Sequence, residues 1–193
     1  KYSRSSRSPA VAKGGTLYYP IWLAYATGVL EKAGHECMLV DAPASGKSLD
    51  EVKKIAREFK PEMPVCDTST PSINNDVGVV RQLKKEWDFF AVLVGTHPSA
   101  LPEETLRMGE EIDAVTVHEY DYTVKELAEN VAKGKSNAAD LKKIAGIAFF
   151  DGKKFVKTTE RKPIENLDEL PFVSNVYKKH LNIRDYFYSA NLY

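Results

Sequence analysis

The sequence has little cysteine, no net charge and no long apolar run. Its two cysteines, Cys37 and Cys66, lie in apolar, strand-like contexts among 193 residues. This predicts buried free thiols rather than a disulfide framework, a metal site or the ligands of an iron–sulfur cluster. Lysine plus arginine and aspartate plus glutamate both number 27, so net charge does not direct the chain to nucleic acid or to an anionic membrane. No apolar run approaches the roughly 20 residues that span a bilayer, and no signal peptide is visible, which predicts a cytoplasmic protein.

Two motifs of nucleotide-binding α/β domains are also missing. No Gly-x-Gly-x-x-Gly occurs, which disfavours a dinucleotide site, although Asp41 at the end of a predicted strand could bind a ribose hydroxyl. No Asp-x-Asp occurs, which counts against a glycosyltransferase-like nucleotide-sugar domain. The cluster His118-Glu119-x-Asp121 matches no established spacing of metal ligands, so no metal site is predicted.

Helix-like and strand-like runs alternate along the first two thirds of the chain. Apolar residues at helical spacing predict helices over residues 21–33, 48–59, 73–87, 102–108 and 123–132. Continuous apolar runs predict strands over 36–41, 63–67, 89–94 and 114–117. Ser48 and Glu51 are spaced as a capping box, and Trp22 is assigned to the core. The alternation predicts an α/β, Rossmann-like (flavodoxin-like) fold with an open parallel sheet and helices on both faces.

The two ends of the chain differ from this pattern. Residues 147–157 are predicted to form a hairpin, because Asp151-Gly152 suits a tight primed turn. The sequence after Pro163 has no clear period and is interpreted as a connector. We therefore expect a Rossmann-like domain over 1–145 and a hairpin with a connector over 146–193. Residues 1–19 lack an apolar run and are interpreted as a loop after a missing first strand, with a basic start that is either a solvated end or a phosphate-binding arm.

Three polar segments follow predicted strands and precede predicted helices. In an open parallel sheet, ligands bind outside the carboxyl ends of the strands, where such segments meet. The candidate ligand-binding residues are Thr68, Ser69, Thr70, Ser72, Gly95, Thr96, His97, Ser99, Glu119 and Tyr120, together with Tyr18 and Tyr19, which could line a flat macrocycle.

Several of these residues also have a purely structural interpretation. Ser72 and Asp121 are each well placed to cap the following helix, and Gly95 could simply form a tight turn. Glu119 is expected to hydrogen-bond a ligand amide. His97 has no carboxylate or thiol near it in sequence, so it is weak as a metal ligand or as an acid–base group.

Six segments in this order resemble the amino-terminal cobalamin-binding domain of radical S-adenosylmethionine enzymes. These segments are residues 18–25, 30–36, 39–43, 94–104, 113–123 and 163–172. The family includes anaerobic magnesium-protoporphyrin monomethyl ester cyclase-like proteins and cobalamin-dependent methyltransferases. The resemblance implies that the chain binds cobalamin for methyl transfer or tetrapyrrole-type modification. It also implies that S-adenosylmethionine and a [4Fe–4S] cluster bind in a following barrel domain, so that this chain alone is not catalytic.

The sequence departs from the best-known cobalamin domains at one point. Those domains carry Asp-x-His-x-x-Gly, whose histidine binds cobalt from below, and none of the four histidines here stands in that pattern. We therefore expect cobalamin without a histidine lower ligand. The alternative function is a flavodoxin-like or receiver-like interaction module without a large cofactor. Asp67 would be its phosphorylated residue, although the first-strand region is basic where a receiver is acidic.

Overall fold

One five-stranded sheet forms the centre of the molecule, in the order β1-β2-β3-β4-β5. The computed structural model describes residues 17–186, so the basic start of the chain lies outside the described residues. Strands β1 (Val65–Thr68), β2 (Val92–Gly95) and β3 (Ala114–Thr116) are parallel. Strands β4 (Ile147–Asp151) and β5 (Lys154–Lys157) form the predicted hairpin, which continues the sheet in antiparallel sense. The predicted Rossmann-like α/β fold is confirmed.

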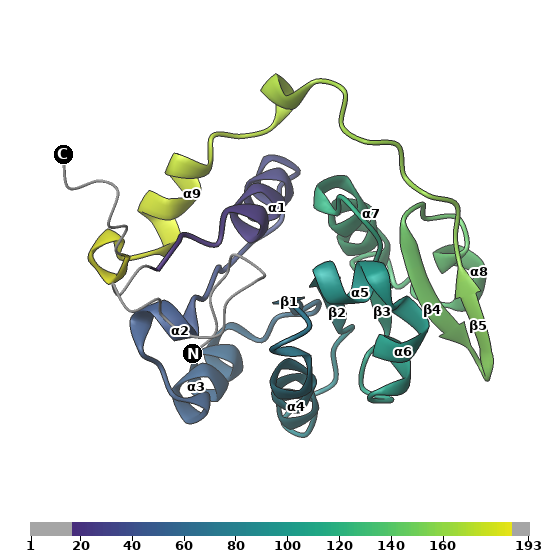
Figure 1. Cartoon of the computed structure of the whole chain (residues 1–193). Helices are drawn as coiled ribbons and strands as arrows, with labels where there is room; N and C mark the ends of the chain where they lie inside the picture. The colour runs from purple at the N-terminus through teal and green to yellow at the C-terminus, as the bar shows by residue number, and fades with distance from the viewer. Residues whose placement is uncertain (1–16, 187–193) are drawn as a thin grey trace.

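Helices cover both faces of the sheet (Figure 1). One face carries α1 (Ile21–Lys32), α7 (Asp121–Val131) and α8 (Ala138–Leu141). The other carries α3 (Leu49–Phe59), α4 (Ile73–Lys84) and α6 (Pro102–Arg107). The remaining helical segments are α2 (Ala42–Ser45), α5 (Thr96–Ala100), η1 (Leu167–Glu169), α9 (Val173–His180) and η2 (Ile183–Asp185).

The core consists of two layers that share the same strands. Val92 and Val94 of β2 pack against the α1/α7 layer, whereas Leu93 between them packs against the α4/α6 layer. All three are almost completely buried, because successive side chains of a strand point to opposite faces and both faces are covered. This matches the continuous apolar run from which the strand was predicted.

The strand predicted over residues 36–41 is wrong. This segment is extended but belongs to no ladder, because no strand of the described residues lies beside it. A strand requires a neighbour for its N–H and C=O groups, and the Leu39 N–H donates to the imidazole of His180 (Nδ1, 3.4 Å) instead. Asp41, placed at the end of that strand, caps α2 by accepting from the Ala44 N–H (3.1 Å).

The core assignment of Trp22 is also wrong. Its side chain is 63% exposed, because it lies in the first turn of α1, before the buried stretch that begins at Ala24.

The capping box of Ser48 and Glu51 is confirmed in both directions. The two cysteines are free thiols that are partly buried.

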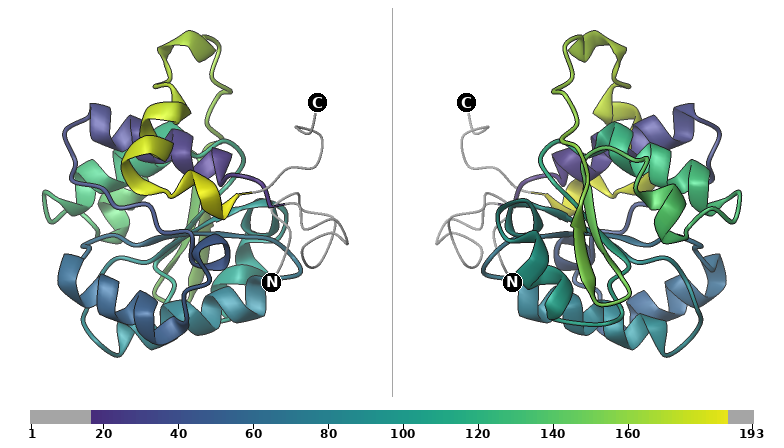
Figure 2. Two further views of the ribbon diagram at one scale, coloured as in Figure 1. Left: turned by 90° about the vertical axis from the view of Figure 1, so that its left-hand side faces the viewer. Right: turned by 90° about the vertical axis from the view of Figure 1, so that its right-hand side faces the viewer.

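Four α-helices were not predicted from the sequence: the short helices α2 and α8, and two that bear on the site and the connector. Thr96–Ala100 forms α5, where a polar loop was expected, and Val173–His180 forms α9 within the connector. Helix α9 packs against α1 and buries Val176 there. The segment that leads to it, which we call the strap (residues 160–172), runs from the end of β5 past α7 and α1 to α9, as Figures 1 and 2 show from three sides.

Candidate functional site

The three polar segments predicted from the sequence lie together at one edge of the sheet. We call this the carboxyl edge: it comprises the ends of β1 and β2 with the residues that follow them (67–72 and 95–99) and residues 117–121 after β3. The short helix α5 contacts all three parallel strands and occupies the centre of the edge. The sheet therefore brings together ten of the twelve predicted ligand residues, all except Tyr18 and Tyr19.

The hydroxyl groups after β1 bond mainly to one another. Thr68 donates to the Asp76 carboxylate of α4 (2.7 Å), and Ser72 Oγ lies 3.2 Å from both the amide and the hydroxyl of Ser69. Ser72 is the N-cap residue of α4, but its side chain accepts no cap hydrogen bond. The side-chain cap predicted for Ser72 is thus wrong. Thr70, in the same loop, is exposed to solvent.

Gly95 is required where β2 ends. Its φ of 109° lies in the range that residues with a side chain rarely adopt, and a Cβ would overlap the Asp67 carboxylate and the Thr68 carbonyl oxygen. The chain can therefore turn from β2 into α5 directly against the end of β1. Thr96, the next residue, is exposed at the edge.

His97 is buried beneath this edge with half of its ring unpaired. Its Nδ1 lies 3.1 Å from Thr70 Oγ1, which holds the imidazole between the loops after β1 and β2. Its Nε2 is buried without a hydrogen-bond partner among residues 17–186, and the whole residue is only 4% exposed. An unpaired buried ring nitrogen costs about 1–3 kcal/mol, which marks this position as one where a polar partner is lacking.

Tyr120 has a similar unpaired polar atom. The residue is 7% exposed and packs in the α1/α7 layer, and no group in the described part of the chain bonds to its hydroxyl. Burial raises the pKa of the phenol well above its usual value, and the carboxylates of Asp67 and Asp121 raise it further. At the pH of a cell the hydroxyl is therefore neutral and can act as a hydrogen-bond donor.

The loop after β3 is held on both sides. The His118 N–H donates to Ser99 Oγ (3.0 Å), and the Ser99 hydroxyl donates to the Gly95 carbonyl (2.7 Å). Glu119 accepts a hydrogen bond from a backbone amide, as expected, but the amide is that of Ile164 in the strap (2.8 Å).

Asp121 does not cap α7, because it is the first residue of the helix and Tyr120 is the N-cap. Burial raises the pKa of the Asp121 carboxyl to about 6, and the nearby Glu119 adds to this increase, although a hydrogen bond from the residue's own backbone opposes it. This part of the edge therefore changes charge near neutral pH.

The two predicted tyrosines belong to the segment before α1 rather than to the three loops of the carboxyl edge. Tyr19 is stacked between Tyr177 (centroids 4.4 Å apart) and Tyr186 (4.1 Å), so both faces of its ring are covered. Tyr186 also donates to the Asp41 carboxylate (2.7 Å). Tyr18 is 41% exposed. Tyr19 thus holds Tyr186, the last described residue, in place by stacking. The sequence around Tyr19 could not predict this role, because both stacking partners lie far away in sequence.

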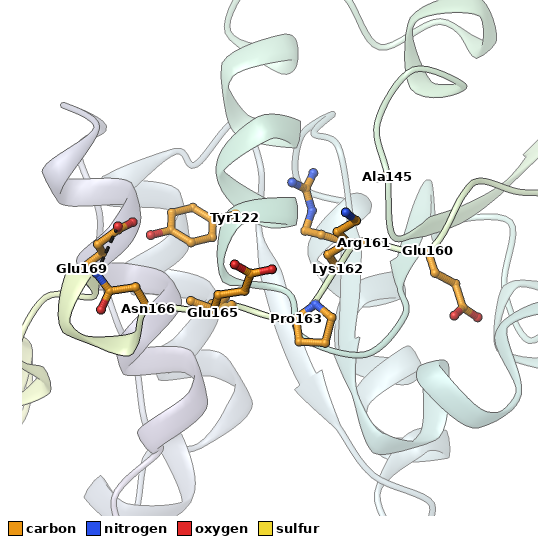
Figure 3. A pocket seen from close by; sticks show the side chains of 10 residues that line it. Tyr122, Ala145, Glu160, Arg161, Lys162, Pro163, Glu165, Asn166 and Glu169 are labelled. Atoms are coloured by element: carbon orange, nitrogen blue, oxygen red, sulfur yellow. Dashed lines mark hydrogen bonds between the residues drawn. The ribbon is translucent and has the colours of Figure 1, made fainter.

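A cavity of about 570 Å³ lies beside the loop after β3, between the start of α7 and the strap (Figure 3). Tyr122, Ala145 and strap residues from Glu160 to Glu169 line it. Sequence reasoning missed this cavity, because the strap has no periodic signal that would place it there.

Within residues 17–186, no group of three histidine, cysteine or acidic side chains is arranged to hold a metal ion. In the same range, no helix has the length and hydropathy of a transmembrane span.

Comparison with known families identifies related domains. A profile of the B12 binding domain matches residues 7–128, which include all three polar segments. An uncharacterized methyltransferase of Pyrococcus horikoshii is 32% identical over 162 residues. The anaerobic magnesium-protoporphyrin IX monomethyl ester cyclase of Rubrivivax gelatinosus is 32% identical over 156 residues. These alignments cover 83% and 78% of this chain but only 34% and 28% of the relatives, so the chain spans about a third of their length.

Two solved structures share the fold. The radical S-adenosylmethionine methyltransferase TsrM of Kitasatospora setae, solved with cobalamin and a [4Fe–4S] cluster, superposes with a TM-score of 0.63 at 16% identity. This alignment covers 84% of this chain and 29% of TsrM. The cobalamin-dependent radical enzyme OxsB superposes with a TM-score of 0.61 at 14% identity, over 76% of this chain and 21% of OxsB.

Proposed function

This chain belongs to the B12-binding domain family, and from that premise we propose that it holds cobalamin at the carboxyl edge as one module of a radical S-adenosylmethionine enzyme. The main support is that the family match covers the edge at which two buried side chains lack polar partners. His97 Nε2 and Tyr120 Oη are both buried and unpaired, on loops that meet where α/β sheets bind ligands. Cobalamin carries several amide groups and one phosphate group. These groups can donate and accept the hydrogen bonds that His97 Nε2 and Tyr120 Oη lack.

The residues of the edge fit a large polar cofactor. Thr70 and Thr96 are exposed residues of the loops after β1 and β2, and the missing side chain of Gly95 lets the end of β2 lie directly against the end of β1. The Tyr120 hydroxyl stays protonated and donates, and Thr70 fixes the imidazole of His97 through Nδ1 so that Nε2 is the atom left for a partner. When bound, the cofactor supplies a cobalt centre that carries a methyl group or an electron. The residues of this chain bind it, orient it and exclude water from its buried side.

The reaction of the whole protein is a finer proposal. The two curated relatives are a methyltransferase and a magnesium-protoporphyrin cyclase, so methyl transfer or tetrapyrrole-type modification is the expected chemistry. S-adenosylmethionine and the [4Fe–4S] cluster would then bind outside residues 1–193, in a barrel domain. The proposed division of this chain is a cofactor domain over 1–145 and a hairpin with a connector over 146–193.

We also propose that cobalt has no histidine beneath it. No histidine of the sequence stands in the Asp-x-His-x-x-Gly pattern, and we assign the free Nε2 of His97 to an amide or phosphate group of the cofactor instead of cobalt. A visible absorption titration with hydroxocobalamin and methylcobalamin, followed by desalting, tests both points. Retained corrin with a base-off spectrum is expected, and the spectrum of His97→Ala should be the same.

The possible results separate the two proposals. A histidine-ligated spectrum that is lost in His97→Ala would keep the cobalamin site and overturn the absent lower ligand. Failure to retain either corrin would overturn the cobalamin site. The receiver-like alternative predicts instead that acetyl phosphate labels Asp67, and the family match gives that outcome no support.

A further inference from the structure

The loop after β3 connects the carboxyl edge to the strap through a short series of hydrogen bonds. On the edge side, a single hydroxyl joins two loops: Ser99 donates to Gly95 O (2.7 Å) and accepts from the His118 N–H (3.0 Å). On the strap side, Glu119 accepts from the Ile164 N–H (2.8 Å). His118 and Glu119 are adjacent residues, so the two sets of bonds act on the same piece of backbone.

This piece of backbone is short and firmly held at both ends. His118 has a φ of 65°, in the left-handed region that residues other than glycine enter only when their surroundings fix them. Val117 before it and Tyr120 after it are both buried in the core. A movement of His118 at the edge must therefore shift the Glu119 carboxylate as well.

The strap is docked next to this contact by a second set of polar bonds. Arg161 donates to Thr123 Oγ1 (2.8 Å) and pairs with Glu126, both on α7. Glu160 lies 3.7 Å from the His118 imidazole. Beyond Ile164 the strap passes the cavity beside Tyr122, and Figure 3 shows the side chains of Pro163 and Glu165 on this stretch. The Glu119–Ile164 hydrogen bond thus links the edge to the part of the strap that borders the cavity, beside the His118–Glu160 contact.

We propose that Glu119 is a positioning residue that couples occupancy of the carboxyl edge to docking of the strap. This inference rests on the proposed function, because cobalamin is the ligand that would occupy the edge. A ligand that contacts the loops after β2 and β3 fixes Ser99 and His118, which holds Glu119 in place to accept from Ile164. Because such coupling is reciprocal, strap docking strengthens ligand binding by the same factor by which the ligand stabilises the docked strap.

The strap side offers a variant that leaves the edge untouched. Ile164→Pro removes the N–H that Glu119 accepts, and Ile164→Val keeps that N–H while trimming the side chain. Affinity for hydroxocobalamin, measured by absorption titration, should fall by about three- to tenfold in Ile164→Pro, the range of a modest coupling free energy. In Ile164→Val it should stay within about twofold of the unmodified protein.

Hydrogen exchange measured by mass spectrometry gives a readout that does not depend on activity. In the unmodified protein, hydroxocobalamin should slow exchange of the amides in residues 160–168. In Glu119→Ala these amides should exchange faster without ligand and respond less to it. Glu165→Ala is the matched control, because Glu165 lies on the same stretch and has no hydrogen bond among residues 17–186 in the structure.

The outcomes distinguish this coupling from the binding proposal. Retained corrin with unchanged exchange in 160–168, and equal affinities of Ile164→Pro and Ile164→Val, would overturn the coupling alone. Failure of the unmodified protein to retain corrin would overturn both proposals. Slowed exchange in the presence of corrin together with weakened binding by Ile164→Pro would support the coupling.

Discussion

At the scale of single residues, the carboxyl edge carries polar atoms that the fold buries but does not satisfy. Among residues 17–186, His97 Nε2 and Tyr120 Oη lack partners, as do Glu111 Oε2 before β3 and Thr116 Oγ1 in β3. Each unpaired atom costs about 1–3 kcal/mol, so these positions lower the stability of the free chain. Residues of this kind are expected where a ligand completes the hydrogen bonding.

Tyr120→Phe tests this interpretation. Removing a hydroxyl that has no partner should raise the free energy of unfolding of the free protein by about 1 kcal/mol, because no hydrogen bond is lost and a buried polar atom disappears. The same change should weaken retention of cobalamin if the hydroxyl binds it. Urea unfolding and the absorption titration measure the two effects. A Tyr120→Phe protein that is both less stable and unchanged in binding would contradict the interpretation, and Tyr122→Phe is the control.

Asp121 should make stability depend on pH. Burial raises the pKa of its carboxyl from 3.8 to about 6 in the folded protein. The protonated Asp121 carboxyl therefore makes its full contribution to the stability of the folded protein below pH 3.8. This contribution is lost as pH rises through about 6. Asp121→Asn removes this loss. We expect the variant to gain about 1–2 kcal/mol relative to the unmodified protein between pH 4 and pH 8, less than the full shift implies because solvent screens this partly exposed carboxylate.

Urea midpoints of the two proteins at pH 4, 6 and 8 check this prediction. A stability difference that is the same at all three values would show that Asp121 titrates normally. Asp140→Asn serves as the comparison, because its hydrogen bonds to Lys143 and Asn137 lower the pKa of that exposed carboxyl.

At the scale of elements, the docking of α9 and the strap onto α1 determines the shape of that side of the molecule. Pro171 and Val176 approach Gly28 so closely that a Cβ there would lie 3.1 Å from Pro171 Cβ and 3.2 Å from Val176 Cγ2. Glu31 pairs with Lys179 and His180 one turn further along. The Lys179 and His180 contacts lower the pKa of the Glu31 carboxyl, although burial opposes them.

Two helical glycines provide a matched test of this packing. Gly78 in α4 has open space around it, so Gly78→Ala should stabilise the protein by about 0.5–1 kcal/mol through helix propensity alone. Gly28→Ala gains the same propensity, but the added methyl group must displace Pro171 and Val176. Its free energy of unfolding should therefore be lower than that of Gly78→Ala by at least about 1 kcal/mol. Equal stabilisation by both changes would mean that α9 and the strap pack loosely on α1.

At the scale of the whole molecule, the two core layers are not independent. Strands β2 and β3 place alternate side chains in the α1/α7 layer and in the α4/α6 layer. If one layer lost its packing, the strands that it shares with the other layer would become disordered as well. The chain from residue 17 to residue 186 is therefore expected to unfold as one cooperative unit.

Trp22→Phe makes this expectation measurable. Trp22 is exposed, so its loss should change stability by less than about 0.5 kcal/mol. Trp87, packed against Phe89 in the α4/α6 layer, is then the single tryptophan in the sequence. Its fluorescence and the near-ultraviolet circular dichroism of the tyrosines stacked on α9 should show the same urea midpoint. A tyrosine signal lost at clearly lower urea would show that α9 unfolds separately.

The sequence by itself determined the alternation of strands and helices and the positions of the polar loops. Local periodicity is sufficient for this, because a strand buried on both faces needs a continuous apolar run and a surface helix needs a 3.6-residue stripe. The capping box at Ser48 and the Asp151-Gly152 turn are equally local. The ordered segments that resemble cobalamin-binding domains likewise needed only the sequence.

Only the tertiary structure decided the features that depend on partners far away in sequence. Residues 36–41 are not a strand because no neighbouring strand among residues 17–186 pairs with them, although their apolar pattern suits one. Glu119 binds Ile164, and Tyr19 stacks between Tyr177 and Tyr186, through contacts that span 45 or more residues. Such contacts leave no periodic signal, because each depends on how separate elements approach one another rather than on the spacing of residues within one element.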